Sequence, residues 1–147
     1  MSGQVRWFMP FIILILLAVG CSYTEQSQSG EMPEMIKVQL VIPDKASLHK
    51  PVSLQVKLTQ GGVPVINADQ VQFQIWNELE DAPAVSPEQG MMSADKLEEQ
   101  GALKASEAEK GLYEVQYTFE QAGTYVVQAH VTHEAMHSMP RGKIQVE

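Results

Sequence analysis

Three of the four histidines and two of the eight methionines of this chain lie within about ten residues near its C-terminus. Imidazole nitrogen and thioether sulfur form a soft to borderline ligand set that suits copper, and the thioether selects Cu(I). His137 and Met139 are two residues apart, so in an extended segment both side chains point the same way and one ion can take both. The spacing therefore predicts a copper site centred on these two residues.

The sequence does not decide which further residues bind the same copper ion. His130 and His133 are the nearest further imidazoles, and Met91-Met92 lies in a long acidic segment that can fold across the site. Methionine also fills gaps in protein cores, so Met136 and Met91-Met92 have a packing interpretation beside the metal interpretation.

Apolar and polar residues alternate along much of the remaining chain, which is typical of half-buried antiparallel strands. The alternation is clearest in residues 52–58, 71–75 and 113–119, and weaker in 36–42, 125–132 and 143–146. Gly61-Gly62, Ala122-Gly123 and residues 67–69 supply turns between these segments. Six or seven short strands in about 110 residues predict an all-β fold, an immunoglobulin-like antiparallel β-sandwich of about seven strands.

Four details of this sandwich follow from side-chain parity and turn chemistry. Tyr125, at the start of a late strand, matches the tyrosine corner of immunoglobulin-like folds, although an ordinary hairpin has the same pattern. Trp76 has the opposite parity from its apolar neighbours, so it either folds over the core or is partly exposed. If residues 127, 129 and 131 face the core, His130 lies on the exposed face of its strand. The segment after Ser93 forms either a short helix with Ser93 as N-cap or one or two edge strands.

The first twenty residues have the form of a bacterial export signal. Arg6 precedes an apolar run over residues 7–19, which is shorter than the roughly 20 residues of a membrane-spanning helix. The sequence LAVGC at 17–21 resembles the lipobox, in which the cysteine becomes lipidated. We expect a lipoprotein signal peptide at 1–20, a lipidated Cys21 and flexible tether at 21–35, and a domain at 36–147 held on the extracytoplasmic face of the cell membrane. An uncleaved anchor helix is the alternative, and it places the domain on the same side.

Composition narrows the class of function. Eighteen acidic residues against ten Lys and Arg give a formal net charge of −8, which disfavours binding to nucleic acid and to anionic lipid headgroups. Cys21 is the only cysteine, so the domain has no internal disulfide and no thiol nucleophile. The chain also lacks a Gly-x-Ser-x-Gly elbow and a phosphate-binding glycine loop. We therefore expect a binding protein rather than an enzyme.

Several segments together resemble the YtkA-like family, which is related to FixH-like domains. They are Gly111-Leu112-Tyr113, the strand at 123–132, Met136-His137-x-Met139-Pro140, and the Phe-Gln-Ile-Trp segment at 73–76. The resemblance covers residues 36–147. It implies an immunoglobulin-like sandwich in a secreted or lipid-anchored protein of a Gram-positive bacterium, with a role in copper handling during assembly of haem–copper respiratory oxidases.

Residue by residue, the resemblance extends to His130, Met136, His137 and Met139. It also gives Met91-Met92 the place of a His or Met that the family often has between the tryptophan strand and the Gly-x-Tyr strand. His133 is supported by the local sequence alone.

Two functions remain in competition. The first is a copper-binding module that passes copper to a membrane oxidase subunit or to another copper carrier. The second is an immunoglobulin-like interaction module that docks to a membrane or cell-wall complex and whose histidines are incidental. Removal of the histidines distinguishes them, because only the first function depends on imidazole.

Overall fold

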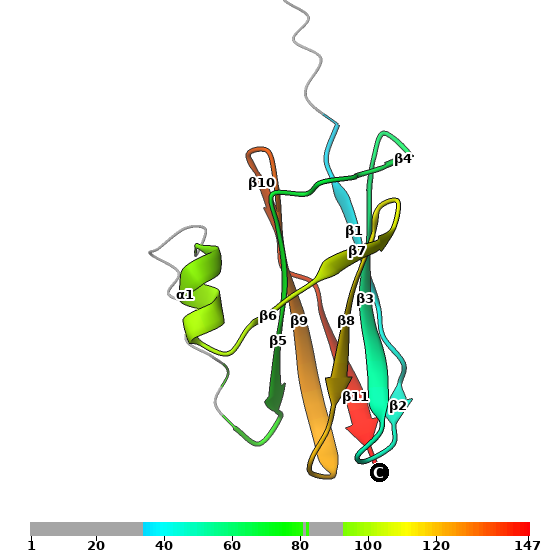
Figure 1. Ribbon diagram of the computed structural model, residues 1–147, viewed down its shortest axis with the longest axis vertical. Helices are drawn as coiled ribbons and strands as arrows, with labels where there is room; N and C mark the ends of the chain where they lie inside the picture. Colours follow the sequence, from blue (N-terminus) through cyan, green and yellow to red (C-terminus); the bar gives the residue numbers. More distant parts are fainter. Residues whose placement is uncertain (1–33, 81, 83–92) are drawn as a thin grey trace, which may run out of the picture. The chain divides into compact units, whose positions relative to one another are not determined.

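The structure is a computed structural model that describes residues 34–80, 82 and 93–147. Their strands form two sheets that face each other (Figure 1). The first sheet has the order β1 (Lys37–Val41), β3 (Pro51–Gln60), β8 (Leu112–Thr118) and β7 (Ser106–Glu109), with β4 (Val63–Pro64) paired to β3. The second has the order β2 (Lys45–Ala46), β11 (Arg141–Val146), β9 (Gly123–His133), β5 (Gln70–Asn77) and β6 (Leu103–Lys104), with β10 (Met136–Ser138) paired to β9.

This architecture confirms the predicted immunoglobulin-like sandwich. Each of the six predicted segments is a strand, and the pairings are antiparallel except for the short parallel contact of β2 with β11. The sequence did not reveal the additional strands β2, β4, β6, β7 and β10. They are two to four residues long, which is too short to show a periodic pattern.

The core lies between the two sheets and is built from the apolar positions of the alternating strands. Leu54, Val56 and Leu58 of β3 are fully buried against Phe73 of β5 and residues 127, 129 and 131 of β9. Full burial of an aliphatic or aromatic side chain of this size contributes about 1.5–3 kcal/mol. The period-two pattern therefore fixes which face of each strand meets the core.

The chain crosses from the first sheet to the second between β8 and β9. The Tyr125 hydroxyl donates a hydrogen bond to the backbone carbonyl of Gln121 at 3.2 Å, and its ring packs on Phe119 with centroids 4.7 Å apart. This is the predicted tyrosine corner. The hairpin alternative is wrong, because β8 and β9 belong to different sheets.

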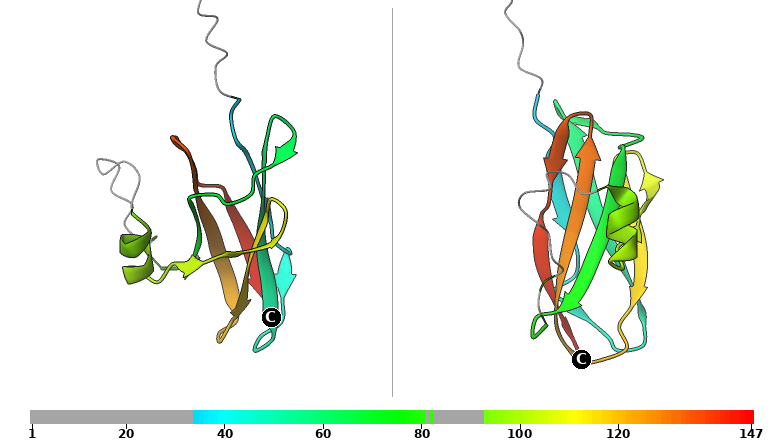
Figure 2. Two further views of the ribbon diagram at one scale, coloured as in Figure 1. Left: turned by 45° about the horizontal axis from the view of Figure 1, so that its top comes forward. Right: turned by 90° about the vertical axis from the view of Figure 1, so that its left-hand side faces the viewer.

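The helix α1 (Ala94–Glu99) covers the outer face of the second sheet at β5 (Figure 2, right). Its Leu97 is fully buried, and the side-chain amide of Gln72 donates to the Ala94 carbonyl at 3.1 Å. Ser93 occupies the N-cap position, but its side chain makes no capping hydrogen bond. The two predicted alternatives for this region are both present, since the helix is followed by the short strands β6 and β7.

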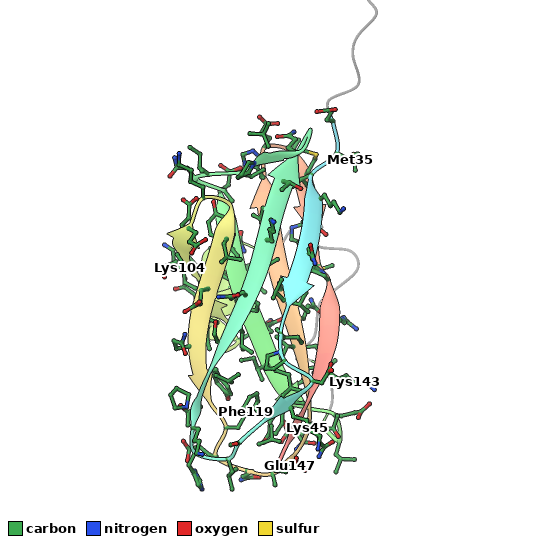
Figure 3. All side chains as sticks on the ribbon, turned by 90° about the vertical axis from the view of Figure 1, so that its right-hand side faces the viewer. Met35, Lys45, Lys104, Phe119, Lys143 and Glu147 are labelled. Carbon is green, nitrogen blue, oxygen red and sulfur yellow. The ribbon has the colours of Figure 1, made fainter. Side chains whose placement is uncertain are left out.

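The two ends of the sandwich are distinct. Met35, close to where the described chain begins, lies at one end, and the paired side chains of Lys45 and Glu147 lie at the other (Figure 3). Met35 is 77% exposed. Val63 and Ile66, two other apolar residues of this region, are also exposed but to a lesser degree. Within the described part of the chain, no helix is long and apolar enough to cross a membrane.

Candidate metal-binding site

A buried polar layer lies on the outer face of the second sheet. Gln72 and Gln74 of β5 stand opposite His130 and Gln128 of β9, and all four side chains are at most 2% exposed. The prediction that His130 is exposed is therefore wrong. Strand parity placed it correctly on the side away from the core, but that side is covered by other segments, including α1, rather than by solvent.

The hairpin from β9 to β10 decides which predicted ligands share this face. Its register pairs His133 with Met136 and Thr132 with His137, and paired residues of an antiparallel ladder point to the same side. His137 therefore lies beside Thr132 on the outer face, and its Nδ1 is 3.0 Å from the Thr132 hydroxyl oxygen. His130, two residues before Thr132, is on the same face.

His133 and Met136 lie on the opposite side of the hairpin. The sulfur of Met136 accepts a hydrogen bond from the backbone N–H of Ile36 at 3.4 Å. The Nδ1 atom of His133 is buried and has no hydrogen-bond partner among the described residues. His133 also helps to line a hollow together with Val63 and Ile66. The structure thus places these two predicted ligands on a different side from His130, His137 and Met139.

His130, His137 and Met139 converge on the outer face. The side-chain amide nitrogen of Gln128 lies 3.0 Å from Nε2 of His130 and donates to the sulfur of Met139 at 3.5 Å. The rings of His130 and His137 have centroids 6.3 Å apart. Two imidazoles that share an ion each have their centroid about 3 Å from it, given metal–nitrogen bonds of about 2 Å. The observed separation is at the upper limit of this geometry, so one shared ion requires the two rings to approach it from nearly opposite sides.

Three residues that the sequence analysis did not select hold these donors in place. Gln74 places its carbonyl oxygen 2.7 Å from Nε2 of His130. Arg141 donates from Nε to the carbonyl oxygen of the Gln128 side chain, which turns the amide nitrogen toward His130 and Met139. The sequence carried no direct signal for these residues, because their need for polar partners arises only once the sheet face is covered.

Trp76 lies beside this polar layer and contacts one of the residues that hold it. It lies on the outer face at 9% exposed, and the guanidinium carbon of Arg141 stands 5.7 Å from the centre of its ring. Neither predicted placement, over the core or partly exposed, describes this position. The parity argument was sound, but it could not show that an arginine from β11 covers the ring.

Burial favours the neutral form of both site histidines. Burial lowers the pKa of His130 to about 4, with smaller contributions from His137 and the positive charge of Arg141. Burial also lowers the pKa of His137, against a raising contribution from the Val131 backbone carbonyl. A neutral imidazole has one unprotonated ring nitrogen, which is the form that binds metals.

The donor set is small and opens to solvent on one side. Met139 is 41% exposed, whereas His130 is 1% exposed. Among the described residues, no three His, Cys, Asp or Glu side chains gather where they could hold a metal. The predicted lipidation site Cys21 and the predicted ligands Met91 and Met92 lie outside the described residues. The described donors are therefore two imidazoles and one thioether.

A family model described as YtkA-like matches residues 31–130. The chain belongs to the YtkA-like family. This confirms the resemblance inferred from the sequence, and it supports an extracytoplasmic accessory domain. The matched range includes His130 and ends before His137 and Met139. No curated protein matches the chain.

Solved structures resemble this YtkA-like domain in fold. An endo-β-1,4-mannanase from Thermotoga petrophila is 11% identical, with a TM-score of 0.50 over 81% of this chain and 21% of its own. An engineered protein is 14% identical, with a TM-score of 0.50 over 78% of this chain and 21% of its own. The filamin domain of Lin-41 is 12% identical, with a TM-score of 0.46 over 78% of this chain and 97% of its own. The chain thus spans about a fifth of the first two proteins, and the likeness concerns the sandwich alone.

Proposed function

We propose that this protein binds Cu(I) on the outside of the cell membrane and delivers it to a haem–copper respiratory oxidase during assembly. The observation that carries the proposal is the gathering of His130, His137 and Met139 on one face of the second sheet. The register of the β9–β10 hairpin places them on one face, apart from His133 and Met136.

The chemistry of the three donors favours copper over the hard divalent cations. Thioether and imidazole ligands suit Cu(I), whereas Mg²⁺ and Ca²⁺ require oxygen ligands. Neutral histidines need not lose a proton before binding, so the metal competes with few protons above pH 6.5. The rigid support of His130 by Gln74 and Gln128 positions one donor before the ion arrives.

The site has the properties of a carrier. Met139 reaches solvent, so a recipient can approach the ion from that side. Two imidazoles and one thioether leave room for a ligand from a partner, which permits transfer without a free ion. The recipient, an oxidase subunit or another copper carrier, is inferred from the family resemblance and from no contact in the structure.

One observation favours the competing function, an interaction module without metal. His130 is buried and within hydrogen-bond distance of two glutamines, which is also the arrangement of a structural histidine. In that case copper binding is absent and the layer serves only to attach α1 and the β10 segment to the sheet.

A titration of Cu(I) into the full chain in detergent, against a chelator of known affinity, tests the proposal. We expect one ion per chain, and a loss of at least about tenfold in affinity in both His137→Ala and Met139→Ala, about 1.4 kcal/mol. The matched controls are His133→Ala and Met136→Ala, which remove the same groups from the other side of the hairpin and should bind within about threefold of the parent. A parent that is folded by circular dichroism and binds no Cu(I) would leave the interaction module as the better function.

Membrane attachment through Cys21 has its own test. In a bacterial host, Cys21→Ser should move the protein out of the detergent phase in a detergent partition, and mass spectrometry should find the lipid only on the parent. A Ser22→Ala variant should behave as the parent. Retention of the Cys21→Ser chain in the membrane would instead support the uncleaved anchor helix.

A further inference from the structure

A continuous chain of contacts links the charged side chain of Arg141 to the donors. Its Nε donates to the Gln128 carbonyl oxygen, and the nitrogen of the same amide contacts both His130 and Met139. One amide group therefore separates a permanent positive charge from two donors. The contact of the guanidinium with Trp76 fixes the arginine from a second side.

Other charges packed against this face are placed differently. Lys143, two residues further along β11, pairs with Glu78. Glu98 of α1 accepts a hydrogen bond from Gln72 at 3.1 Å and is exposed, so solvent screens its charge. Neither makes a described contact with His130, His137 or Met139.

We propose that Arg141 sets the charge selectivity of the site, so that it holds a monovalent cation and disfavours a divalent one. This inference rests on the proposed function and adds to it a residue that is not a ligand. The repulsion between a guanidinium and a bound ion grows in proportion to the ion's charge, so Cu(II) is destabilised twice as strongly as Cu(I). The soft thioether of Met139 and the positive charge of Arg141 therefore both favour Cu(I) over Cu(II).

Gln128 makes this arrangement specific. Its carbonyl oxygen is engaged by Arg141, so its amide nitrogen is directed at the donors and cannot present an oxygen ligand to the ion. Cu(II) accepts oxygen ligands more readily than Cu(I), and the orientation of this amide withholds the Gln128 oxygen. Loss of the Arg141 contact frees the amide to turn over.

The test compares Cu(I) and Cu(II) affinities of the full chain in detergent, each by competition with a chelator of known affinity. In Arg141→Gln, the ratio of Cu(II) affinity to Cu(I) affinity should rise by about tenfold, which lowers the reduction potential of bound copper by about 59 mV. Arg141→Met, which keeps an apolar stem on Trp76, should show the same rise. Arg141→Lys keeps the charge and should retain most of the parent's selectivity.

Lys143→Gln is the matched control, because it removes one positive charge from the same face of the same strand. Its affinity ratio should stay within about threefold of the parent. An unchanged ratio in both neutral variants of Arg141, with Cu(I) still bound, would overturn the selectivity proposal and leave the copper site standing. A parent that binds no Cu(I) would overturn the proposed function itself, and the selectivity proposal with it.

Discussion

Replacing His130 with glutamine lowers the affinity for Cu(I) by about a hundredfold or more, equivalent to about 2.7 kcal/mol. This is the largest effect expected from a single ligand. The imidazole of His130 is buried and held between Gln74 and Gln128, so binding costs it little side-chain entropy. His137 and Met139 are less buried and lose more freedom when the ion binds.

The choice of glutamine separates metal binding from folding. Its amide can still form hydrogen bonds with Gln74 and Gln128, but it lacks a nitrogen lone pair for Cu(I). The matched control is His133→Gln, on the other side of the β9–β10 hairpin, which should bind within about threefold of the parent. Parent-like affinity in a folded His130→Gln chain would show that His130 is a structural residue and that the site lies elsewhere.

The metal-free protein loses about 3 kcal/mol of stability between pH 6.5 and pH 4 through His130 alone. The pKa of His130 is about 4 in the folded state, against an ordinary value of 6.5 in the unfolded chain. Between these two values the unfolded chain binds a proton that the folded chain does not, so falling pH favours unfolding. The loss is absent above pH 6.5, grows as the pH falls toward 4, and changes little further below that.

Urea unfolding at a series of pH values, with a chelator present, measures this loss. The side chains of Asp and Glu also titrate in this range, so the relevant quantity is the difference between parent and His130→Gln. That difference should shrink by about 3 kcal/mol as the pH falls from 7 to 4, because the variant lacks the titrating ring. Parallel curves for parent and His130→Gln would contradict the lowered pKa.

The lowered pKa of His130 also affects copper binding at acidic pH. Protons and copper compete for the imidazole nitrogen, and a histidine that stays neutral to about pH 4 remains available in an acidic medium. A surface histidine near its ordinary pKa of about 6.5 becomes increasingly protonated below that pH. Burial of His130 thus destabilises the empty domain in acid while it protects the metal-binding form of the ligand.

The sequence determined the sandwich because alternation of apolar and polar residues directly records which side of a strand is buried. Leu54, Val56 and Leu58 are fully buried as that pattern required, and Tyr125 makes the predicted corner with Gln121. The residue types of the C-terminal cluster likewise indicated soft-metal chemistry. Both inferences depend on local chemistry, which a single sequence contains.

The tertiary structure decided which members of that cluster lie together. The β9–β10 hairpin turns at Glu134, which adopts a φ of 53° and donates its N–H to Asp69, a residue 65 positions away. No glycine marks this turn, so the pairing of Thr132 with His137, and of His133 with Met136, was not evident from the sequence. One residue of slip in that register would place His137 on the other face.

Tertiary structure also decided what covers the outer face. Alternation shows that His130 points away from the core, but it cannot show that α1 lies over the same sheet or that Arg141 from β11 engages Gln128 beside it. Polar residues on alternating strands usually face solvent, so the pattern alone did not single out the glutamines of β5. Their burial depends on segments distant in sequence, and for that physical reason only the folded structure revealed the polar layer that positions the candidate site.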